Sequence, residues 1–188
     1  MKDVFKRIRG FKMTDYVSKS KTEIRTALTG VYYDPTGYEV ATDSYILVWR
    51  KMEVPDDLSG KLMLPNGGVV ERSVFNYPNW KSIVPLHKKG LPEFFLDFDK
   101  LNYFAADWKE NKEGKTIGIV KIAGHYFNID RVMLFIKAMK YAVEDTCYIK
   151  ESKEMATAQI GFGSMDGMGG LLQSYTQSES CSWKVYKL

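Results

Sequence analysis

One amphipathic segment, residues 129–144, constrains the fold of this chain more than any other feature. Asn128 or Asp130 is placed to cap its N-terminus. At 100° per residue, one broad apolar face is formed by Val132, Phe135, Ile136, Met139, Ala142 and Val143. The opposite stripe holds Asp130, Met133, Lys137, Lys140 and Glu144. Such a helix needs a partner layer to cover its apolar face, so the segment predicts a helix packed on a globular core.

A second helix is predicted over residues 99–110. Its apolar residues Leu101, Phe104, Ala105 and Trp108 recur at helical spacing on one face. Asp97 or Asp99 is available as the N-cap, and Gly114 is the expected stop. We therefore expect two main helices, both in the second half of the chain.

Strand patterns surround these helices, and aromatic residues make up 14% of the sequence. Before the helices, residues 31–33 and 38–52 flank an Asp-Pro-Thr-Gly turn, and residues 69–75 also look extended, while 53–68 are loop material. Further strands are expected at 116–123, 146–151, 156–161 and 170–175. Helices and strands segregated along the chain predict an α+β fold with antiparallel sheets.

The 188 residues fit a single domain, 1–188. A basic, proline-flanked stretch at 86–92 is the best linker, which divides the domain into halves of about 1–86 and 92–176. Residues 177–188 form a C-terminal extension, in which 181–186 alternate like one more strand. A short helix over residues 3–11 is also expected.

Motifs for catalysis or cofactors do not emerge from the sequence. His87 and His125 have no partner at metal-ligand or triad spacing, and each fits a solvated or hydrogen-bonded histidine. The glycine-rich run 161–170 places Asp166 where a nucleotide loop needs its third glycine, so a hairpin turn is expected. Cys147 and Cys181 are too few for a disulfide framework or a zinc site. We predict a protein that is not an enzyme and binds no cofactor.

Charge and hydropathy bear on location and partners. The formal net charge of +4 is mildly basic and compatible with nucleic acid. The N-terminal residues lack the apolar core of a signal peptide, and the apolar runs are too short to span a bilayer. The expectation is a soluble, cytoplasmic protein with no membrane association.

Several segments together resemble the bacterial DNA polymerase III beta subunit, the DNA sliding clamp. Residues 25–31 (RTALTGV) and 40–45 (VATDSY) are similar to the clamp's R-P-x-L-x-G-V strand and its V-A-T-D-G-H-R-L segment. Residues 75–85 (FNYPNWKSIVP) are similar to a G-x-F-P-D-Y-x-x-V-I-P strand, and 127–139 (FNIDRVMLFIKAM) to F-N-x-x-Y-L-L-D-A-L-K-A-L. Residues 170–175 stand where the clamp has its last strand. The resemblance covers about residues 22–176.

This resemblance implies a DNA-clamp-like domain built from two β-α-β-β-β-type halves and a function without chemistry. Its helices would face duplex DNA and meet the phosphates without reading bases. That nominates as DNA-binding residues Lys137, Lys140, Lys100, Lys109 and Arg131. Lys100 and Lys109 on the earlier helix, together with Lys6, Arg7 and Arg9 at the N-terminus, are weaker candidates than Lys137 and Lys140. A merely solvated helix face explains the same stripe equally well, because Asp130 and Glu144 dilute its charge.

The resemblance also implies a hydrophobic pocket that takes short peptide motifs of polymerases or clamp loaders. Carried over residue by residue, its lining is Thr42, Ser44, Tyr45, Leu47, Pro85, Leu171 and Gln173. Leu47 and Leu171 are equally well read as ordinary core residues.

The sequence departs from the clamp pattern in ways that leave the function open. The chain is roughly half as long as a three-domain clamp subunit, and Ser44-Tyr45-Ile46 replaces the usual Gly-His-Arg. One clamp-like domain per chain would need about six copies to close a ring. The leading hypothesis is a sliding-clamp-like protein of DNA replication, a processivity factor. Alternatives are a clamp-derived interaction module, such as a phage or mobile-element adaptor that does not encircle DNA, and a scaffold with an accidental likeness.

Overall fold

The structure is a computed structural model that describes residues 11–20, 25–84, 90–114, 116–152, 157–176 and 183–188. Within these ranges the fold is α+β, as predicted. The helices are α1 (Trp80–Ile83), α2 (Phe98–Glu110) and α3 (Ile129–Ala142), of which α2 and α3 are the two predicted main helices. None of the helices in the described residues combines the length and apolarity that a membrane-spanning helix needs.

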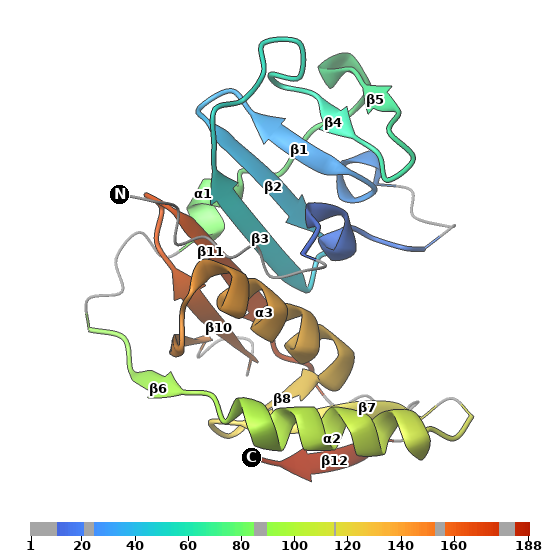
Figure 1. The fold of residues 1–188 in the computed structure, drawn as a ribbon, viewed down its shortest axis with the longest axis vertical. Helices are drawn as coiled ribbons and strands as arrows, with labels where there is room; N and C mark the ends of the chain where they lie inside the picture. The colour runs from blue at the N-terminus through green and yellow to red at the C-terminus, as the bar shows by residue number, and fades with distance from the viewer. Residues whose placement is uncertain (1–10, 21–24, 85–89, 115, 153–156, 177–182) are drawn as a thin grey trace, which may run out of the picture.

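Most strands belong to one nine-stranded sheet in the order β5-β4-β1-β2-β3-β11-β10-β9-β6, in which every pair is antiparallel. The first half supplies β1 (Val31–Asp34), β2 (Tyr38–Thr42), β3 (Ile46–Lys51), β4 (Leu62–Met63) and β5 (Val69–Val70). The second supplies β6 (Glu93–Phe95), β9 (Thr146–Ser152), β10 (Thr157–Gly163) and β11 (Met168–Gln173). The two halves meet where β3 pairs with β11 (Figure 1).

A second sheet has the order β12-β7-β8, with β7 (Ile117–Ile122), β8 (His125–Asn128) and β12 (Trp183–Lys187). The expected strand in the C-terminal extension is therefore present, and β12 runs parallel to β7 along its edge. Lys184 Nζ lies 2.7 Å from Asp107 Oδ2 of α2, and the Tyr186 ring stacks on Phe104 at 5.0 Å. These contacts hold β12 beneath α2 (Figure 1).

Helix α3 begins as predicted, because the Asn128 side chain accepts a hydrogen bond from the Arg131 backbone N–H at 3.1 Å. Val132, Phe135, Ile136 and Met139 are buried on the sheet. Burying side chains of this size stabilises the fold by about 1.5–3 kcal/mol each. The predicted apolar face is too long, however: Val143 is 81% exposed and adopts a left-handed conformation (φ 59°) that ends the helix.

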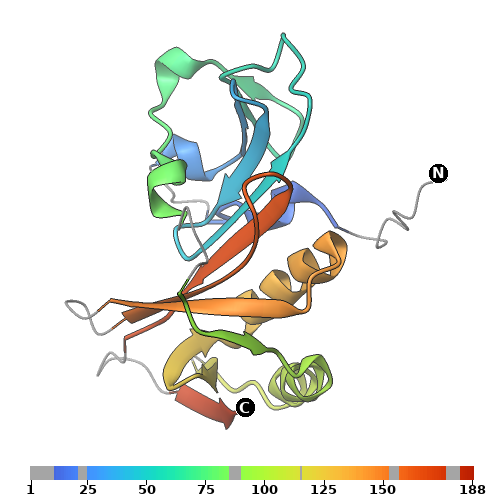
Figure 2. The same cartoon turned by 90° about the vertical axis from the view of Figure 1, so that its left-hand side faces the viewer.

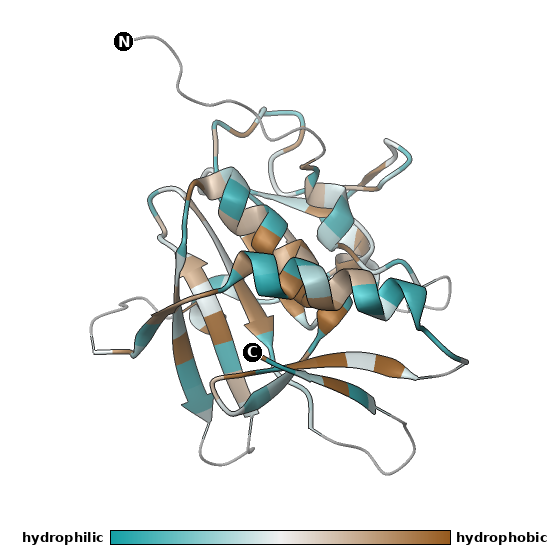
Figure 3. Ribbon diagram, turned by 60° about the horizontal axis from the view of Figure 1, so that its bottom comes forward, coloured by the Kyte–Doolittle hydropathy of each residue, from teal (hydrophilic) through white to brown (hydrophobic). Residues whose placement is uncertain are grey.

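Helix α2 also begins as predicted, with Asp97 accepting from the Lys100 backbone N–H at 2.9 Å. It ends at Glu110, so Gly114 is not its stop, contrary to expectation. Figure 2 shows α2 and α3 on one side of the large sheet and α1 on the other. In Figure 3, α2 and α3 lie side by side, and hydrophilic residues follow the outward side of α2. We call the side of the large sheet covered by α3 its helical face and the other its outer face.

The least regular part of the first half differs from the sequence predictions. Of the expected strand over 69–75, Val69–Val70 is extended and residues 72–74 form a 3-10 turn. In the part of the chain that the structure describes, the polar residues after Val70 have no strand beside them to pair with. Leu62–Met63, expected in a loop, pairs with β1. Residues 80–83, within a segment that resembles a clamp strand, form helix α1.

The glycine-rich run is a hairpin turn between β10 and β11, as predicted. The expected helix over 3–11 and most of the linker lie outside the described residues.

Candidate functional site

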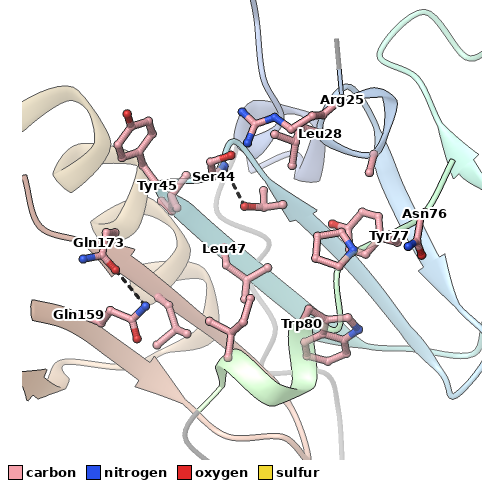
Figure 4. Close-up of a pocket in the computed structure, with 16 residues that line it drawn as sticks. Arg25, Leu28, Ser44, Tyr45, Leu47, Asn76, Tyr77, Trp80, Gln159 and Gln173 are labelled. Atoms are coloured by element: carbon pink, nitrogen blue, oxygen red, sulfur yellow. Dashed lines mark hydrogen bonds between the residues drawn. The ribbon is translucent and has the colours of Figure 1, made fainter. Parts of the chain in front are cut away.

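An apolar cavity of about 320 Å³ opens on the outer face of the large sheet, where β3 pairs with β11. Its floor is the register pair Leu47 and Leu171, which are 7% and 3% exposed. Side chains alternate along a strand, so Leu172, next along β11, faces the core under α3 instead. Trp80 of α1 closes one wall of the cavity (Figure 4). The cavity volume is at the low end for small-ligand pockets and suits a few apolar side chains.

The turn between β2 and β3 shapes one end of this cavity. Asp43 Oδ1 accepts hydrogen bonds from the backbone N–H groups of Tyr45 and Ile46, both at 2.9 Å. Thr42 Oγ1 accepts from the Ser44 N–H at 3.1 Å. Ser44 has φ 80°, in the left-handed region that favours glycine. The turn is thus held by side-chain hydrogen bonds in a conformation that serine alone does not prefer.

Arg131 of α3 fixes the same turn from the side. Its Nε lies 2.8 Å from Asp43 Oδ2, and its guanidinium lies 4.3 Å from the centroid of the Tyr45 ring. Arg131 also donates a hydrogen bond to the Tyr175 hydroxyl, and the rings of Tyr45 and Tyr175 stack at 5.0 Å. Arg131, predicted to contact DNA, therefore has its side chain engaged at the rim of the cavity.

Helix α1 is anchored by Asp34, 46 residues earlier in the chain. Asp34 Oδ2 accepts a hydrogen bond from Trp80 Nε1 at 2.8 Å, and Oδ1 accepts from the Thr36 N–H at 2.8 Å. Burial favours the neutral acid, but the hydrogen bonds from Thr36 and Trp80 and the charge of Lys81 outweigh it and lower the pKa of Asp34. The carboxylate is therefore the form that holds Trp80 in the cavity wall.

The structure brings together most of the residues that the clamp resemblance assigned to a peptide pocket. The cavity is lined by Thr42, Ser44, Tyr45, Leu47, Leu171 and Gln173. Pro85 lies outside the described residues, and Pro78 lines the cavity. Their role in peptide binding stays a prediction.

Further lining residues were missed from the sequence, among them Arg25, Leu28, Trp80, Ile83 and Gln159. Arg25 and Leu28 lie within a segment that the resemblance covers, so their motif was the available signal. Ile83 is 42% exposed at the mouth. Gln159 has no such signal: it reaches the cavity because β10 pairs with β11.

The basic residues predicted to meet DNA are distributed over α2 and α3. Lys137 Nζ forms an ion pair with Asp15 Oδ2 at 2.8 Å, and Lys140 Nζ lies 5.0 Å from the Phe98 ring centroid. Lys100 Nζ lies 5.8 Å from the Phe104 ring, and Lys109 is exposed in the last turn of α2. Lys6, Arg7 and Arg9 lie outside the described residues. DNA contact by these residues stays a prediction.

Two of the histidine and cysteine residues weighed above for catalysis or metal binding, His125 and Cys147, lie in the described part of the chain. His125 Nε2 lies 3.1 Å from Glu151 Oε1, and Cys147 is buried with its Sγ 3.4 Å from Met139 Sδ. His87 and Cys181 lie outside the described residues.

Comparison with known proteins identifies the fold. No family model and no curated protein matches the sequence. Among solved structures, a Caulobacter crescentus beta sliding clamp, with polyethylene glycol at its proposed beta-motif tethering region, matches with a TM-score of 0.58 and 11% identity over 87% of this chain and 62% of that one. The Bartonella birtlesii sliding clamp, DNA polymerase III subunit beta, bound to griselimycin, matches with a TM-score of 0.57 and 14% identity, also over 87% and 62%.

The chain thus has the fold of the bacterial DNA sliding clamps. Caulobacter crescentus pol III beta gives the same result, with a TM-score of 0.56 and 10% identity over 87% of this chain and 61% of that one. The match spans about three fifths of the length of these clamps. This is a divergent, clamp-like chain.

Proposed function

We propose that this chain is a non-catalytic, sliding-clamp-like protein that docks short apolar peptide segments of replication or repair proteins in the cavity between β3, β11 and α1. The observation that carries the proposal is the cavity itself. Six of the seven residues assigned to a pocket by resemblance line one hollow, although the chain separates them by up to 131 positions (173 − 42). Burial of apolar side chains on Leu47 and Leu171 would supply the affinity.

The test is binding of a fluorescent ten-residue peptide that carries two adjacent leucines in a serine-glycine background, followed by anisotropy. Ile83→Asp places a charge at the mouth of the cavity, on a residue that is already 42% exposed. The matched control is Val74→Asp, because Val74 is 65% exposed and does not line the cavity. The proposal requires that Ile83→Asp abolish binding while Val74→Asp leaves it unchanged. Equal affinities for the two variants would reject it.

We also propose weak, sequence-independent association with duplex DNA through α2 and α3. Support comes from Lys100, Lys109 and Lys140 on these adjacent helices and from the net charge of +4. Binding of this kind rests on phosphate contacts and falls steeply with salt. Because Lys137 is paired with Asp15 and Arg131 with Asp43, few phosphates would be neutralised, so affinity should collapse between low and physiological salt.

One observation favours the second candidate, a docking module that does not encircle DNA. Strand β12 covers an edge of β7, and an edge that is already paired is closed to strands of another subunit.

A further inference from the structure

A second cavity, of about 310 Å³, adjoins the apolar one on the outer face of the sheet. The two share Gln159 and Gln173, whose side chains are joined by a 3.0 Å hydrogen bond from Gln159 Nε2 to Gln173 Oε1 (Figure 4). The second cavity adds residues of β9 and β10: Lys150, Glu151, Ser152, Thr157 and Ala158. We call it the polar cavity.

Sheet register explains why one cavity is apolar and its neighbour polar. Leu47 pairs with Leu171, and Leu171 pairs with Gly161, which together form an apolar row across three strands. Two positions along, Gln173 pairs with Gln159 and Gln159 with Lys150, which form a polar row on the same face. The polar row therefore runs beside the apolar row and reaches β9 at Lys150.

Lys150 sets the charge of the polar cavity on this face. The next residue of β9, Glu151, alternates to the helical face, where its carboxylate lies 3.1 Å from His125 Nε2. Lys150 is exposed, and among the lining residues that the structure describes, the other side chains on the outer face are amides and hydroxyls. This arrangement complements a negatively charged side chain with hydrogen-bonding neighbours.

We propose that the polar cavity is a second subsite of the docking site and that it selects peptides with an acidic residue near the apolar anchor. The inference rests on the proposed peptide docking. From Leu171 on β11 to Lys150 on β9 the path crosses two strand spacings, about 9.6 Å, and runs two residues along the strands, so its length is about 12 Å and an extended peptide covers it in about three to four residues. The acidic residue is therefore about three or four positions from the residue that fills the apolar cavity, with Gln159 and Gln173 available to its backbone between them.

The test compares peptide twins in the anisotropy assay. The two peptides of a pair are identical except that one carries Glu and the other Gln, three residues from two adjacent leucines. In one pair this residue precedes the leucines, and in the other pair it follows them. Wild-type protein should bind the Glu twin of one pair about threefold more tightly, as expected for a solvent-exposed ion pair. Lys150→Gln should remove the preference and Lys150→Glu should reverse it. Lys109→Gln, on the helical side, is the matched control and should leave the preference intact.

The outcomes separate this inference from the proposed function. If Glu and Gln twins bind wild-type protein equally in both chain directions, the polar subsite is refuted while peptide docking stands. If no leucine peptide binds at all, both fall. A preference for Glu that survives in Lys150→Glu would also overturn the inference, because the selecting charge would then lie elsewhere.

Discussion

Replacing Arg131 with methionine keeps an unbranched apolar stem on α3 and removes the guanidinium group with its charge. In the native protein Arg131 forms a 2.8 Å ion pair with Asp43, and the two side chains are only 24% and 16% exposed. It also lies over the Tyr45 ring and donates to the Tyr175 hydroxyl. The substitution therefore removes three contacts that together hold the rim of the apolar cavity.

The size of the effect follows from these contacts. Loss of a charged hydrogen-bond partner from a mostly buried carboxylate costs about 1.5–3 kcal/mol. Loss of the cation–π contact adds about 0.5–1 kcal/mol. Allowing for partial exposure of both groups, we expect Arg131→Met to lower the free energy of unfolding by about 2 kcal/mol. Leucine-peptide affinity should also fall, since Tyr45 and Ser44 lose their support.

Urea unfolding measures this change, with Lys137→Met as the matched control on the same helix. Lys137 and Asp15 are 31% and 29% exposed, so loss of that pair should cost no more than about 1 kcal/mol. A double-mutant cycle with Asp43→Asn should give a coupling of about 1 kcal/mol between Arg131 and Asp43. A cost below that of Lys137→Met, with no coupling to Asp43, would refute the assigned role.

Three further predictions follow from other contacts. The double variant Lys137→Glu, Lys140→Glu should lose low-salt duplex binding, measured by anisotropy; unchanged titration would exclude α3 as the DNA face. Removing residues 183–188 uncovers the β7 edge, so light scattering should show a defined self-associated species, and an unchanged mass would argue against edge protection. Because the folded-state pKa of Asp34 is lowered, its contribution to stability is present above its unfolded pKa of about 3.9 and is lost as pH falls through the lower folded value. The urea midpoints of wild type and Asp34→Asn should therefore converge on acidification; a constant gap would contradict this.

Local patterns predicted the two main helices because their caps and apolar spacing are encoded within a few residues. Asn128 and Asp97 start α3 and α2 as expected. The ends were less predictable, since Val143 continues the apolar spacing of α3 but turns into the left-handed region and is exposed. The spacing of apolar residues along a helix does not show where the sheet that covers the helix ends.

In the candidate site, too, short sequence motifs predicted some residues, whereas residues positioned by contacts distant in the sequence were missed. Motif resemblance located Leu47 and Leu171, because each lies in a short recognisable segment. It did not locate Trp80, which lies in the recognisable segment 75–85 but reaches the cavity wall through helix α1 and the hydrogen bond to Asp34. Nor did it locate Gln159, whose position depends on the pairing of β10 with β11. Nor did it show that Arg131 reaches Asp43, 88 residues away in the sequence.

The docking of apolar peptides on the outer face is tested most directly by methyl NMR of the two neighbouring leucines of β11. Leu171 lines the apolar cavity, whereas Leu172 is buried in the core on the helical face. Titration with the leucine peptide should shift the methyl signals of Leu171 and Leu47 in a saturable way and leave those of Leu172 in place. Saturable binding with no shift at Leu171, or with equal shifts at Leu171 and Leu172, would contradict docking in this cavity.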